Sequence, residues 1–467
     1  MNIMKIDPKI FKAYDIRGFA SDEITPELAE LVGRAVVAYT GAKVVVVGRD
    51  MRETSLELSM ALIKGIVASG SDVVDIGLTS TPMFYYAVGA QFENNGNPSA
   101  SSGLGLSPSG AGIMVTASHN PKEYNGFKIV QGDLEPIGEG SGMDKIRDLV
   151  IAGNFSDAPE GNVMETDVRE EYVAKHLEIV PRRDIGGPRV VFDAGNGMAG
   201  FVAPGIIKAY GLEKKCRKMF FELDGAFPNH EPNPVKSENM AALAAMVRKE
   251  SADLGVAYDG DADRVGFVDE TGEPVRGDLM TALFAGEVLR THPGATVLYD
   301  VRSSRAVPEA IKAAGGNPIM CRVGHAFIKK QMRENGAWFA GELSMHYYFR
   351  DFFIAESSDL AMLYVLAAMK RTGKKLSELV APLKKYSHSG EINFPVKDKD
   401  AALAALKKKY SDGKLDRLDG VRIDYPSWWF NVRASNTEPL VRLNLEAETK
   451  EEMDARVEEI TKIINER

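Results

Sequence analysis

Residues 44–50 read Val44-Val45-Val46-Val47-Gly48-Arg49-Asp50. Its β-branched run predicts a strand, and the polar residues after it predict a turn at the strand's end. Thr54 and Glu57 have the spacing of a capping box, so we expect a helix to begin there. The apolar stripe of that helix should carry Leu56, Met60, Ile63 and Val67. A strand, a turn and a helix in this order are typical of an α/β layer.

The same order recurs twice further along the chain. Residues 190–192 form an apolar run followed by Asp193-Ala194-Gly195-Asn196-Gly197, and residues 297–299 are followed by Asp300-Val301-Arg302-Ser303-Ser304. These repeats predict three related α/β domains.

The C-terminal part has a different pattern. Residues 420–432 and 439–445 are predicted strands, and residues 449–465 form an amphipathic helical pattern. Thr449 and Glu452 suit a capping box at the start of this helix. Its apolar face carries Met453, Val457, Ile460 and Ile464. This part of the chain is therefore predicted to be a small α+β domain.

Polar stretches indicate where the domains meet. Such stretches lie near residues 158–166, 270–277 and 387–400. We expect four domains, at residues 1–160, 161–272, 273–385 and 386–467. Residues 93–112 are rich in Gly, Ser, Asn and Pro, and are expected to form a surface insertion.

Composition narrows the class of protein. The chain has 467 residues, of which 44% are hydrophobic and 26% charged, as in a soluble protein of several domains. The net charge of −9 argues against a nucleic-acid partner, and no apolar run approaches a membrane span. Only Cys216 and Cys321 occur, which excludes a disulfide framework and a cysteine zinc cluster. The first twelve residues lack a signal-peptide core, so we expect a cytoplasmic protein.

Asp259-Gly260-Asp261-Ala262-Asp263-Arg264 lies between two apolar runs. Three carboxylates at alternating positions favour a hard cation with oxygen ligands. A calcium EF-hand is excluded because Arg264 stands where that loop needs glycine, and because the flanking runs read as strands. Magnesium is the better interpretation, since it keeps open positions for phosphate oxygens.

Thr116-Ala117-Ser118-His119-Asn120-Pro121 follows another apolar run. Ser118 is a candidate nucleophile at a strand end, with His119 beside it and Lys128 on the next apolar run. An ordinary turn with a surface histidine is the alternative. No Gly-x-Ser-x-Gly surrounds the serine, which argues against an α/β-hydrolase.

Two further segments carry polar groups suited to a phosphosugar. Gly341-Glu342-Leu343-Ser344-Met345-His346 lies among aromatic residues, which suits a sugar ring as well as it suits a strand-edge turn. Arg433-Ala434-Ser435-Asn436-Thr437-Glu438-Pro439, with Arg442, combines two guanidiniums with several hydroxyl, amide and backbone donors. This combination predicts a phosphate-binding loop. There is no Walker A sequence.

In this order the four motifs resemble the α-D-phosphohexomutase superfamily, over essentially the whole chain. Phe11-Lys12-Ala13-Tyr14-Asp15-Ile16-Arg17-Gly18 resembles the phosphomannomutase/phosphoglucomutase branch. The resemblance implies three similar α/β domains around a central cleft and a smaller C-terminal α+β domain. It also implies a mutase that interconverts hexose 1-phosphate and hexose 6-phosphate through a phosphoserine and a hexose 1,6-bisphosphate, which also acts as activator.

The resemblance implies a role for each motif residue. Ser118 would carry the phosphoryl group and, with Asp259, Asp261 and Asp263, hold Mg²⁺. The other implied catalytic residues are Lys128, His325, Arg264, Tyr14, Arg17 and His119. The residues implied to bind the substrate's hydroxyls and its second phosphate are Glu342, Ser344, His346, Arg302, Arg433, Ser435, Asn436, Thr437 and Arg442.

Two residues depart from the family pattern. Met345 stands where most members have a small residue, and Arg302 where many have a lysine. The alternatives are a phosphoglucosamine mutase, a phosphatase with the same phosphoserine, and a catalytically silent phosphosugar-binding protein with a regulatory role. We expect a small-molecule phosphosugar as the partner, and a monomer or a weak homo-oligomer.

Overall fold

The computed structural model describes residues 6–92, 110–156, 158–434 and 440–466. Ser435, Asn436 and Thr437 of the predicted phosphate-binding loop lie outside these residues, as does most of the expected insertion. The chain divides into two compact units: Met1–Val275 with Ser344–Ser377, and Arg276–Leu343 with Glu378–Arg467. We call them unit 1 and unit 2.

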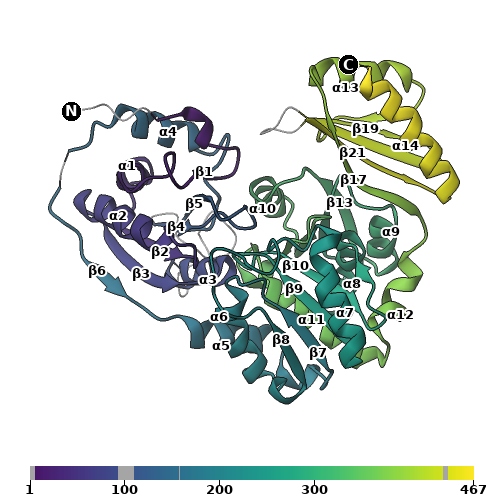
Figure 1. The fold of residues 1–467 in the computed structure, drawn as a ribbon, viewed down its shortest axis with the longest axis horizontal. Coiled ribbons are helices and arrows are strands. Elements are labelled where there is room, and N and C mark those ends of the chain that lie inside the picture. Colours follow the sequence, from purple (N-terminus) through teal and green to yellow (C-terminus); the bar gives the residue numbers. More distant parts are fainter. Residues whose placement is uncertain (1–5, 93–109, 157, 435–439, 467) are drawn as a thin grey trace. The chain divides into compact units, whose positions relative to one another are not determined.

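The N-terminal sheet of unit 1 has the strand order β1-β5-β4-β2-β3-β6 (Figure 1). Its strands are β1 (Ile16–Phe19), β2 (Val44–Arg49), β3 (Asp72–Leu78), β4 (Ala111–Val115), β5 (Tyr124–Gln131) and β6 (Val163–Glu165). Strands β4, β2, β3 and β6 are parallel, and β5 and β1 continue the sheet antiparallel. The turns after β2 and β4 therefore lie at the same edge, where α/β sheets hold their ligands.

Helices cover both faces of this sheet. They are α1 (Pro26–Thr40), α2 (Ser55–Ala68), α3 (Thr81–Phe92) and α4 (Met143–Ala152). Val45 and Val47 pack with α1, α2 and α4 in one hydrophobic cluster. On the other face, a Cβ at Gly112 would lie 2.5 Å from Val88 Cγ2 of α3. Both faces are buried, as the uninterrupted apolar run of β2 requires.

The second sheet of unit 1 has the order β11-β10-β9-β7-β8. Its strands are β7 (Val190–Asp193), β8 (Cys216–Met219), β9 (Leu254–Tyr258), β10 (Val265–Asp269) and β11 (Pro274–Val275). The helices of this region are α5 (Arg169–Ile179), α6 (Ala199–Ala209) and α7 (Ala241–Glu250). Strands β9 and β10 form an antiparallel hairpin, so the three-aspartate motif is its connecting loop.

A later segment of the chain completes unit 1. It consists of β15 (Tyr347–Phe349), β16 (Ala355–Glu356) and α11 (Ser358–Thr372). Strands β15 and β16 pair antiparallel. Residues 344–346, from the predicted sugar-binding loop, enter unit 1 with this segment.

Unit 2 begins with the third strand–turn–helix repeat. Strands β13 (Asn317–Cys321) and β14 (Phe339–Gly341) both pair in parallel with β12 (Thr296–Asp300). The accompanying helices are α8 (Gly277–Thr291), α9 (Ala306–Ala313) and α10 (His325–Glu334). The short helix α12 (Leu376–Val380) follows α11 in the chain.

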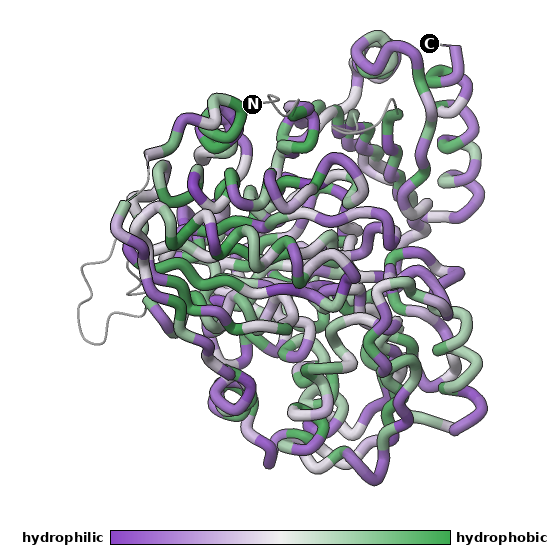
Figure 2. The backbone as a smooth tube through the Cα atoms, turned by 60° about the vertical axis from the view of Figure 1, so that its left-hand side comes forward, coloured by the Kyte–Doolittle hydropathy of each residue, from purple (hydrophilic) through white to green (hydrophobic). Residues whose placement is uncertain are grey.

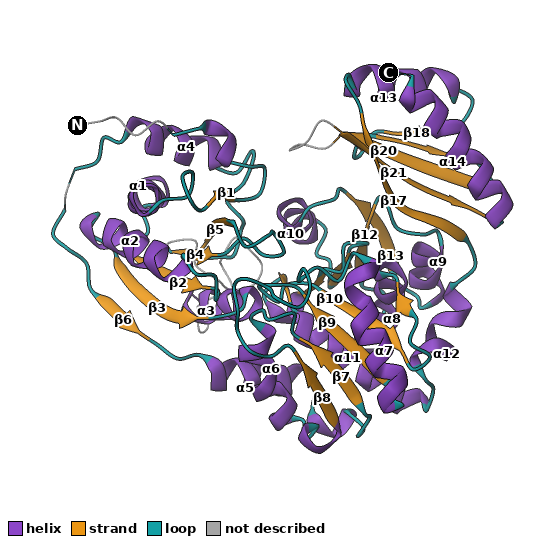
Figure 3. Cartoon of the chain, viewed as in Figure 1, coloured by secondary structure: helices purple, strands orange, loops and turns teal. Residues whose placement is uncertain are grey.

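The C-terminal part of unit 2 is an antiparallel sheet in the order β17-β21-β20-β19-β18. Its strands are β17 (Ser387–Pro395), β18 (Lys414–Asp416), β19 (Val421–Asp424), β20 (Trp428–Ala434) and β21 (Leu440–Ala447). Helices α13 (Lys399–Lys409) and α14 (Lys450–Asn465) pack on one face (Figure 3). Thr449 caps α14 as predicted, since its hydroxyl accepts a hydrogen bond from Glu452 N at 3.2 Å.

Helix α2 begins after Thr54 as predicted, but the structure corrects the predicted capping hydrogen bond and part of the predicted buried face. Thr54 makes no capping hydrogen bond, and its hydroxyl instead accepts one from Asn125 at 2.9 Å. Leu56 and Met60 are 52% and 64% exposed. The buried face runs through Gly65, where a Cβ would lie 2.1 Å from the Glu30 carbonyl oxygen of α1. Close contact between the two helix backbones decides which face is buried.

Two other boundaries differ from the prediction. The strand expected at 420–432 is two strands, β19 and β20, separated by a turn at Tyr425-Pro426-Ser427. Proline lacks the N–H that a continuous central strand would need. The expected insertion ends earlier than residue 112, because Ala111 already begins β4 and Gly110 is buried.

The hydropathy of the chain follows this layering. In Figure 2 the hydrophobic segments gather in the interior strands, and the outer loops and helix faces are hydrophilic. Among the helices of the described residues, none has the length and apolar character needed to cross a bilayer.

A buried carboxylate links α11 to the second sheet. Asp359 is 4% exposed and accepts hydrogen bonds from the hydroxyls of Tyr172, at 2.8 Å, and Tyr258, at 3.2 Å. Burial raises the pKa of Asp359 to about 6, although both tyrosine hydrogen bonds favour the charged form. Tyr258 immediately precedes Asp259, so the Asp359 carboxylate is connected to the aspartate loop through this tyrosine.

Asp359→Asn should change how stability depends on pH. An unfolded aspartate has a pKa of about 3.9, so the raised pKa of folded Asp359 makes the wild type lose stability as the pH rises from about 4 to 6. The loss from this group is at most about 3 kcal/mol. The asparagine variant lacks this loss, so its stability relative to the wild type should be greater at pH 7.5 than at pH 4. Urea unfolding at both pH values measures the difference, and a pH-independent difference would contradict the prediction.

Candidate active site

The predicted nucleophile lies in the turn that follows β4. Ser118 is 3% exposed and has φ of +52°, in the left-handed region that non-glycine residues seldom adopt. Its N–H donates to the Thr116 hydroxyl at 2.9 Å. Strained backbone of this kind gathers at functional sites, where the surrounding structure holds it in place.

The serine hydroxyl points at the aspartate loop. Ser118 Oγ donates to Asp259 Oδ2 at 3.0 Å, and His119 Nδ1 lies 3.2 Å from the same Oγ. Burial, with the nearby cations Arg264 and Arg17, holds the pKa of His119 well below its ordinary value. The ring beside Ser118 is therefore neutral at physiological pH.

Asp259, Asp261 and Asp263 converge as predicted. Each offers a carboxylate oxygen within 4.8 Å of the others, and all three side chains are buried. Burial, then the charges of Asp263 and Asp261, raises the pKa of Asp259 well above its ordinary value. Burial acts on Asp263 in the same direction, but Lys128, His346 and Arg264 outweigh it and lower that pKa.

These carboxylates fit a divalent metal ion. Among the described residues, nothing donates a hydrogen bond to Asp261 Oδ1, although this atom is buried, and Asp263 Oδ1 has only His346 Nε2 at 3.3 Å. Buried carboxylate oxygens without donors are costly unless a cation neutralises them, and hard cations prefer such oxygen ligands. The carboxylate set therefore has open acceptors for a metal.

Neighbouring elements hold the aspartate loop in shape. The Thr81 hydroxyl, at the start of α3, donates to Asp261 Oδ2 at 2.7 Å. The Ser358 hydroxyl, at the start of α11, donates at 2.6 Å to the carbonyl of Ala262, which has φ of +60°. Thr81 and Ser358 were not identified from the sequence, because a single hydroxyl at a helix start carries no distinguishing pattern.

Lys128 reaches the same carboxylates from β5. Its Nζ lies 2.6 Å from Asp261 Oδ2 and 2.5 Å from Asp263 Oδ2. Burial opposes the charged form of this lysine, yet the two carboxylates raise its pKa above the ordinary value. Lys128 is thus a charged ammonium group that partly neutralises the aspartate loop.

His346 lies beside the aspartate loop, on the segment that begins at Ser344. Its Nε2 is 3.2 Å from Arg264 Nε and 3.3 Å from Asp263 Oδ1, and its Nδ1 is 3.4 Å from Ser344 Oγ. Met345 has φ of +69°, which explains why a glycine suits this position in the family pattern.

The N-terminal motif also reaches the serine loop. Arg17 of β1 donates to Asn120 Oδ1 at 2.7 Å and pairs with Asp15. Tyr14 lies just before β1 and is half-buried. Arg17 therefore belongs to the site in unit 1, and the role of Tyr14 stays a prediction.

Unit 2 brings together the other predicted residues. Glu342 is 1% exposed and accepts a hydrogen bond from Gly324 N at 3.1 Å, next to His325 at the start of α10. Arg302 donates to Asp300 Oδ2 at 2.7 Å and lies 3.7 Å from Glu342. These residues follow the ends of the parallel strands β12, β13 and β14.

Glu391 gathers three arginines that were predicted separately. Its carboxylate lies 3.4 Å from Arg302 Nη1, 3.0 Å from Arg433 Nη2 and 3.3 Å from Arg442 Nη1. Burial opposes its ionisation, but the guanidiniums lower the pKa of Glu391 to about 2. The sequence did not identify Glu391, since its partners are up to 89 residues away.

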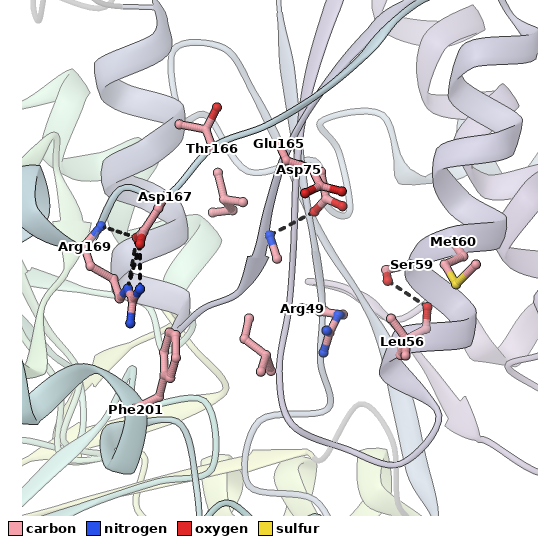
Figure 4. A pocket seen from close by; sticks show the side chains of 13 residues that line it. Arg49, Leu56, Ser59, Met60, Asp75, Glu165, Thr166, Asp167, Arg169 and Phe201 are labelled. Carbon is pink, nitrogen blue, oxygen red and sulfur yellow. Dashed lines mark hydrogen bonds and ion pairs between the residues drawn. The ribbon is translucent and has the colours of Figure 1, made fainter.

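A separate hollow of about 640 Å³ lies away from this chemistry (Figure 4). Its walls include Arg49, Leu56 and Phe201. Asp167 and Arg169, also in its wall, pair with each other at 2.6 Å. Its polar groups do not converge on a common point as the aspartate loop does, so the serine and aspartate loops are the candidate active site.

A buried serine hydroxyl facing a buried carboxylate triad and an ammonium group is the arrangement expected of a metal-dependent phosphotransfer enzyme. Four family models match the chain, described as phosphoglucomutase/phosphomannomutase α/β/α domains I, II and III and the C-terminal domain. They cover residues 8–156, 170–272, 276–386 and 391–463.

Named proteins are similar over nearly the full length. One from Xanthomonas campestris pv. campestris (strain B100), named phosphohexose mutases, is 40% identical, covering 97% of this chain and 98% of the relative. A phosphomannomutase/phosphoglucomutase of Pseudomonas aeruginosa (strain PAO1) is 38% identical, covering 95% and 93%. A solved phosphoglucomutase/phosphomannomutase family protein from Burkholderia thailandensis superposes with a TM-score of 0.85 at 34% identity, covering 98% and 97%.

The chain belongs to the phosphoglucomutase/phosphomannomutase family. The predicted class, three similar α/β domains with a smaller C-terminal α+β domain, is confirmed. The domain boundaries at 160, 272 and 385 and the individual roles of the site residues stay predictions.

Asp261→Asn should weaken binding of a divalent cation, with Mg²⁺ as the probe. Removing one of three anionic ligands should lower the affinity by about tenfold or more. Mg²⁺ should also raise the melting temperature of the wild type more than that of the variant, because the metal binds the folded state. Titration calorimetry and thermal unfolding measure both effects, with exposed Glu57→Gln as the control. Equal affinity in all three proteins would contradict the metal site.

Proposed function

We propose that this chain interconverts hexose 1-phosphates and hexose 6-phosphates, with mannose or glucose as the sugar, through a phosphoserine at Ser118. The observation that carries the proposal is the 3.0 Å hydrogen bond from Ser118 Oγ into the buried aspartate loop. Membership of the family supports the mutase reaction. The name of the Pseudomonas aeruginosa relative, phosphomannomutase/phosphoglucomutase, supports these two sugars.

The reaction consists of two phosphoryl transfers. In the first, the bond between phosphorus and Ser118 Oγ breaks as a substrate hydroxyl oxygen bonds to phosphorus, and a hexose 1,6-bisphosphate forms. The proton lost by that hydroxyl is balanced by the proton that Ser118 Oγ regains. After the bisphosphate turns end over end, the second transfer returns its other phosphate to Ser118. Lys128 and His325 are the proposed acid and base groups.

Charge neutralisation is the main task of the site, since phosphoryl transfer depends on positioning and electrostatics. Asp259, Asp261 and Asp263, with the phosphate on Ser118, are the proposed ligands of Mg²⁺, which supplies positive charge to the transferring group. Arg264 and Arg17 add cationic side chains near the serine loop, and His119 lies against Ser118 Oγ. Hexose 1,6-bisphosphate is the proposed activator, because it can phosphorylate an unphosphorylated Ser118.

The other groups of the substrate must be bound in both orientations of the bisphosphate. Glu342 and Ser344 are proposed to bind the 3- and 4-hydroxyls, with His346 and Arg302 nearby in their respective units. The proposed ligands of the phosphate that is not reacting are Arg433, Ser435, Asn436, Thr437 and Arg442. Contacts with the 3- and 4-hydroxyls do not distinguish the configuration at C2, which is why glucose and mannose phosphates are both proposed as substrates. A cytoplasmic location and a monomer or weak homo-oligomer accompany the proposal.

The proposal is tested by Mg²⁺-dependent conversion of glucose 1-phosphate, mannose 1-phosphate and glucosamine 1-phosphate to their 6-phosphates, with a trace of hexose 1,6-bisphosphate. We expect turnover of the first two sugars, and loss of at least about 10³-fold in Ser118→Ala because no other group carries the phosphate. Ser69→Ala is the matched control, since its hydroxyl bonds only within its own turn, to Gly65 O at 3.0 Å.

Other outcomes would assign a different function. Preference for the amino sugar would indicate a phosphoglucosamine mutase. Release of inorganic phosphate equal to substrate loss would indicate a phosphatase. Substrate binding without turnover would indicate a silent phosphosugar-binding protein.

Glu391→Gln should mainly raise KM. The carboxylate holds Arg433 and Arg442 together, so without it the two guanidiniums repel each other and are less well placed for the phosphate. Because that phosphate is bound equally in the ground and transition states, KM should rise about five- to fiftyfold with kcat changed less than about threefold. Steady-state kinetics measure both constants, with Glu309→Gln as the surface control. A fall in KM would instead mean that Glu391 competes with the phosphate.

A further inference from the structure

Arg52 is a buried arginine between β2 and α2 that the reaction above does not use. It is 3% exposed, and its guanidinium donates to four backbone carbonyls. Nη1 donates to Pro121 O at 2.8 Å and Tyr124 O at 3.0 Å. Nη2 donates to Ser118 O at 2.8 Å and Asn120 O at 2.6 Å. Three of these acceptors lie in the turn that begins at Ser118, and the fourth, Tyr124, is the first residue of β5.

The Arg52 guanidinium supplies a donor to each of these carbonyls, and a buried carbonyl such as that of Ser118 is costly without one. The Pro121 carbonyl also accepts a hydrogen bond from Tyr124 N at 3.1 Å. A planar guanidinium presents several donors in a fixed fork, whereas a lysine ammonium is a single point. Arginine is thus the side chain that can span the turn.

Arg52 is itself fixed on two sides. Asp50 Oδ2 lies 3.3 Å from Arg52 Nε, and Asp50 Oδ1 accepts the hydroxyl hydrogen of Ser55 at 2.5 Å. The ring of Phe227 covers the guanidinium, with its centroid 5.1 Å from Arg52 Cζ. The guanidinium is therefore fixed in the position from which it donates hydrogen bonds to the turn.

The position of the nucleophile depends on one of these carbonyls. The Ser118 carbonyl is held by Arg52 on one side, and on the other it abuts Gly260 of the aspartate loop, where a Cβ would lie 2.4 Å from it. Between these limits Ser118 keeps its left-handed φ of +52°, with Oγ 3.0 Å from Asp259 Oδ2.

We propose that Arg52 is a positioning residue: its guanidinium fixes the turn at 118–124 so that Ser118 Oγ faces the aspartate loop. The proposal rests on the proposed function for its kinetic consequence, but the hold on the turn is a property of the fold. Arg52 acts through the backbone, and contacts with substrate are assigned to other residues.

Arg52→Gln tests this role against Arg49→Gln as a matched control. Arg49 belongs to the same segment, but its side chain lines the separate hollow of Figure 4. A nucleophile displaced by about 1 Å can lose about 10² in rate, so kcat of Arg52→Gln should fall by about that factor. Since substrate contacts are untouched, KM should change by less than about threefold. Arg49→Gln should change neither constant.

Hydrogen exchange of the 118–124 amides gives a readout that does not need turnover. We expect at least about tenfold faster exchange in Arg52→Gln than in Arg49→Gln, because the turn opens locally. Arg52→Lys donates hydrogen bonds from a single nitrogen atom, so its kcat and its amide protection should lie between those of Arg52→Gln and the wild type. If Arg52→Gln does not fold, Phe227→Leu loosens the guanidinium from its covered face and should cause smaller changes of the same kind.

The outcomes separate the two proposals. A wild type without mutase turnover, but with exchange that responds to Arg52, would overturn the proposed function and leave Arg52 as the anchor of the turn. A wild type with turnover, and folded Arg52→Gln with kcat and exchange like those of Arg49→Gln, would overturn the role of Arg52. An equal loss of kcat in Arg49→Gln would overturn it as well.

Discussion

The mutual repulsion of three buried carboxylates is the constraint on which the site in unit 1 depends. Asp259, Asp261 and Asp263 lie within 4.8 Å of one another, at a place where water does not screen their charges. Lys128 opposes that repulsion with two ion pairs. These ion pairs join Lys128 of β5, in the first sheet, to the loop between β9 and β10 of the second sheet. A divalent cation would relieve the same repulsion more completely.

Three residues around this charge cluster have a strained backbone. Ser118, Ala262 and Met345 all have left-handed φ values, of +52°, +60° and +69°. Each strained carbonyl has a partner: Arg52 donates to that of Ser118, Ser358 to that of Ala262, and the Val265 N–H to that of Met345. Strain of about 1–3 kcal/mol per residue persists only where such contacts determine the backbone. These contacts hold the backbone of the candidate site in place, and accurate positioning of this kind favours phosphoryl transfer.

In unit 2 the organising group is an anion rather than a cation. Glu391 holds Arg302, Arg433 and Arg442 close together, and a cluster of guanidiniums without such a counter-ion would separate. Arg302 is also held by Asp300. Glu342 also lies 3.7 Å from Arg302, so three guanidiniums face three carboxylates in this cluster. In unit 1 clustered carboxylates offer oxygen atoms to a cation, whereas in unit 2 a carboxylate holds clustered arginines together.

The strands that carry the motifs and the helix that begins after Thr449 could be predicted from the sequence alone, and Ser118 and the three aspartates could be singled out as candidate site residues. These features are local, because a strand run, a cap or a motif is complete within a few residues. The folded chain was needed to show that Gly65, rather than Leu56 and Met60, lies on the buried face of α2, since a neighbouring helix backbone selects that face. It was also needed to find the carbonyls that Arg52 binds and the arginines that Glu391 binds, which lie up to 72 and 89 residues away. A charge in a sequence carries no mark of its partner, because electrostatic and hydrogen-bond contacts depend on distance in space and not on separation along the chain.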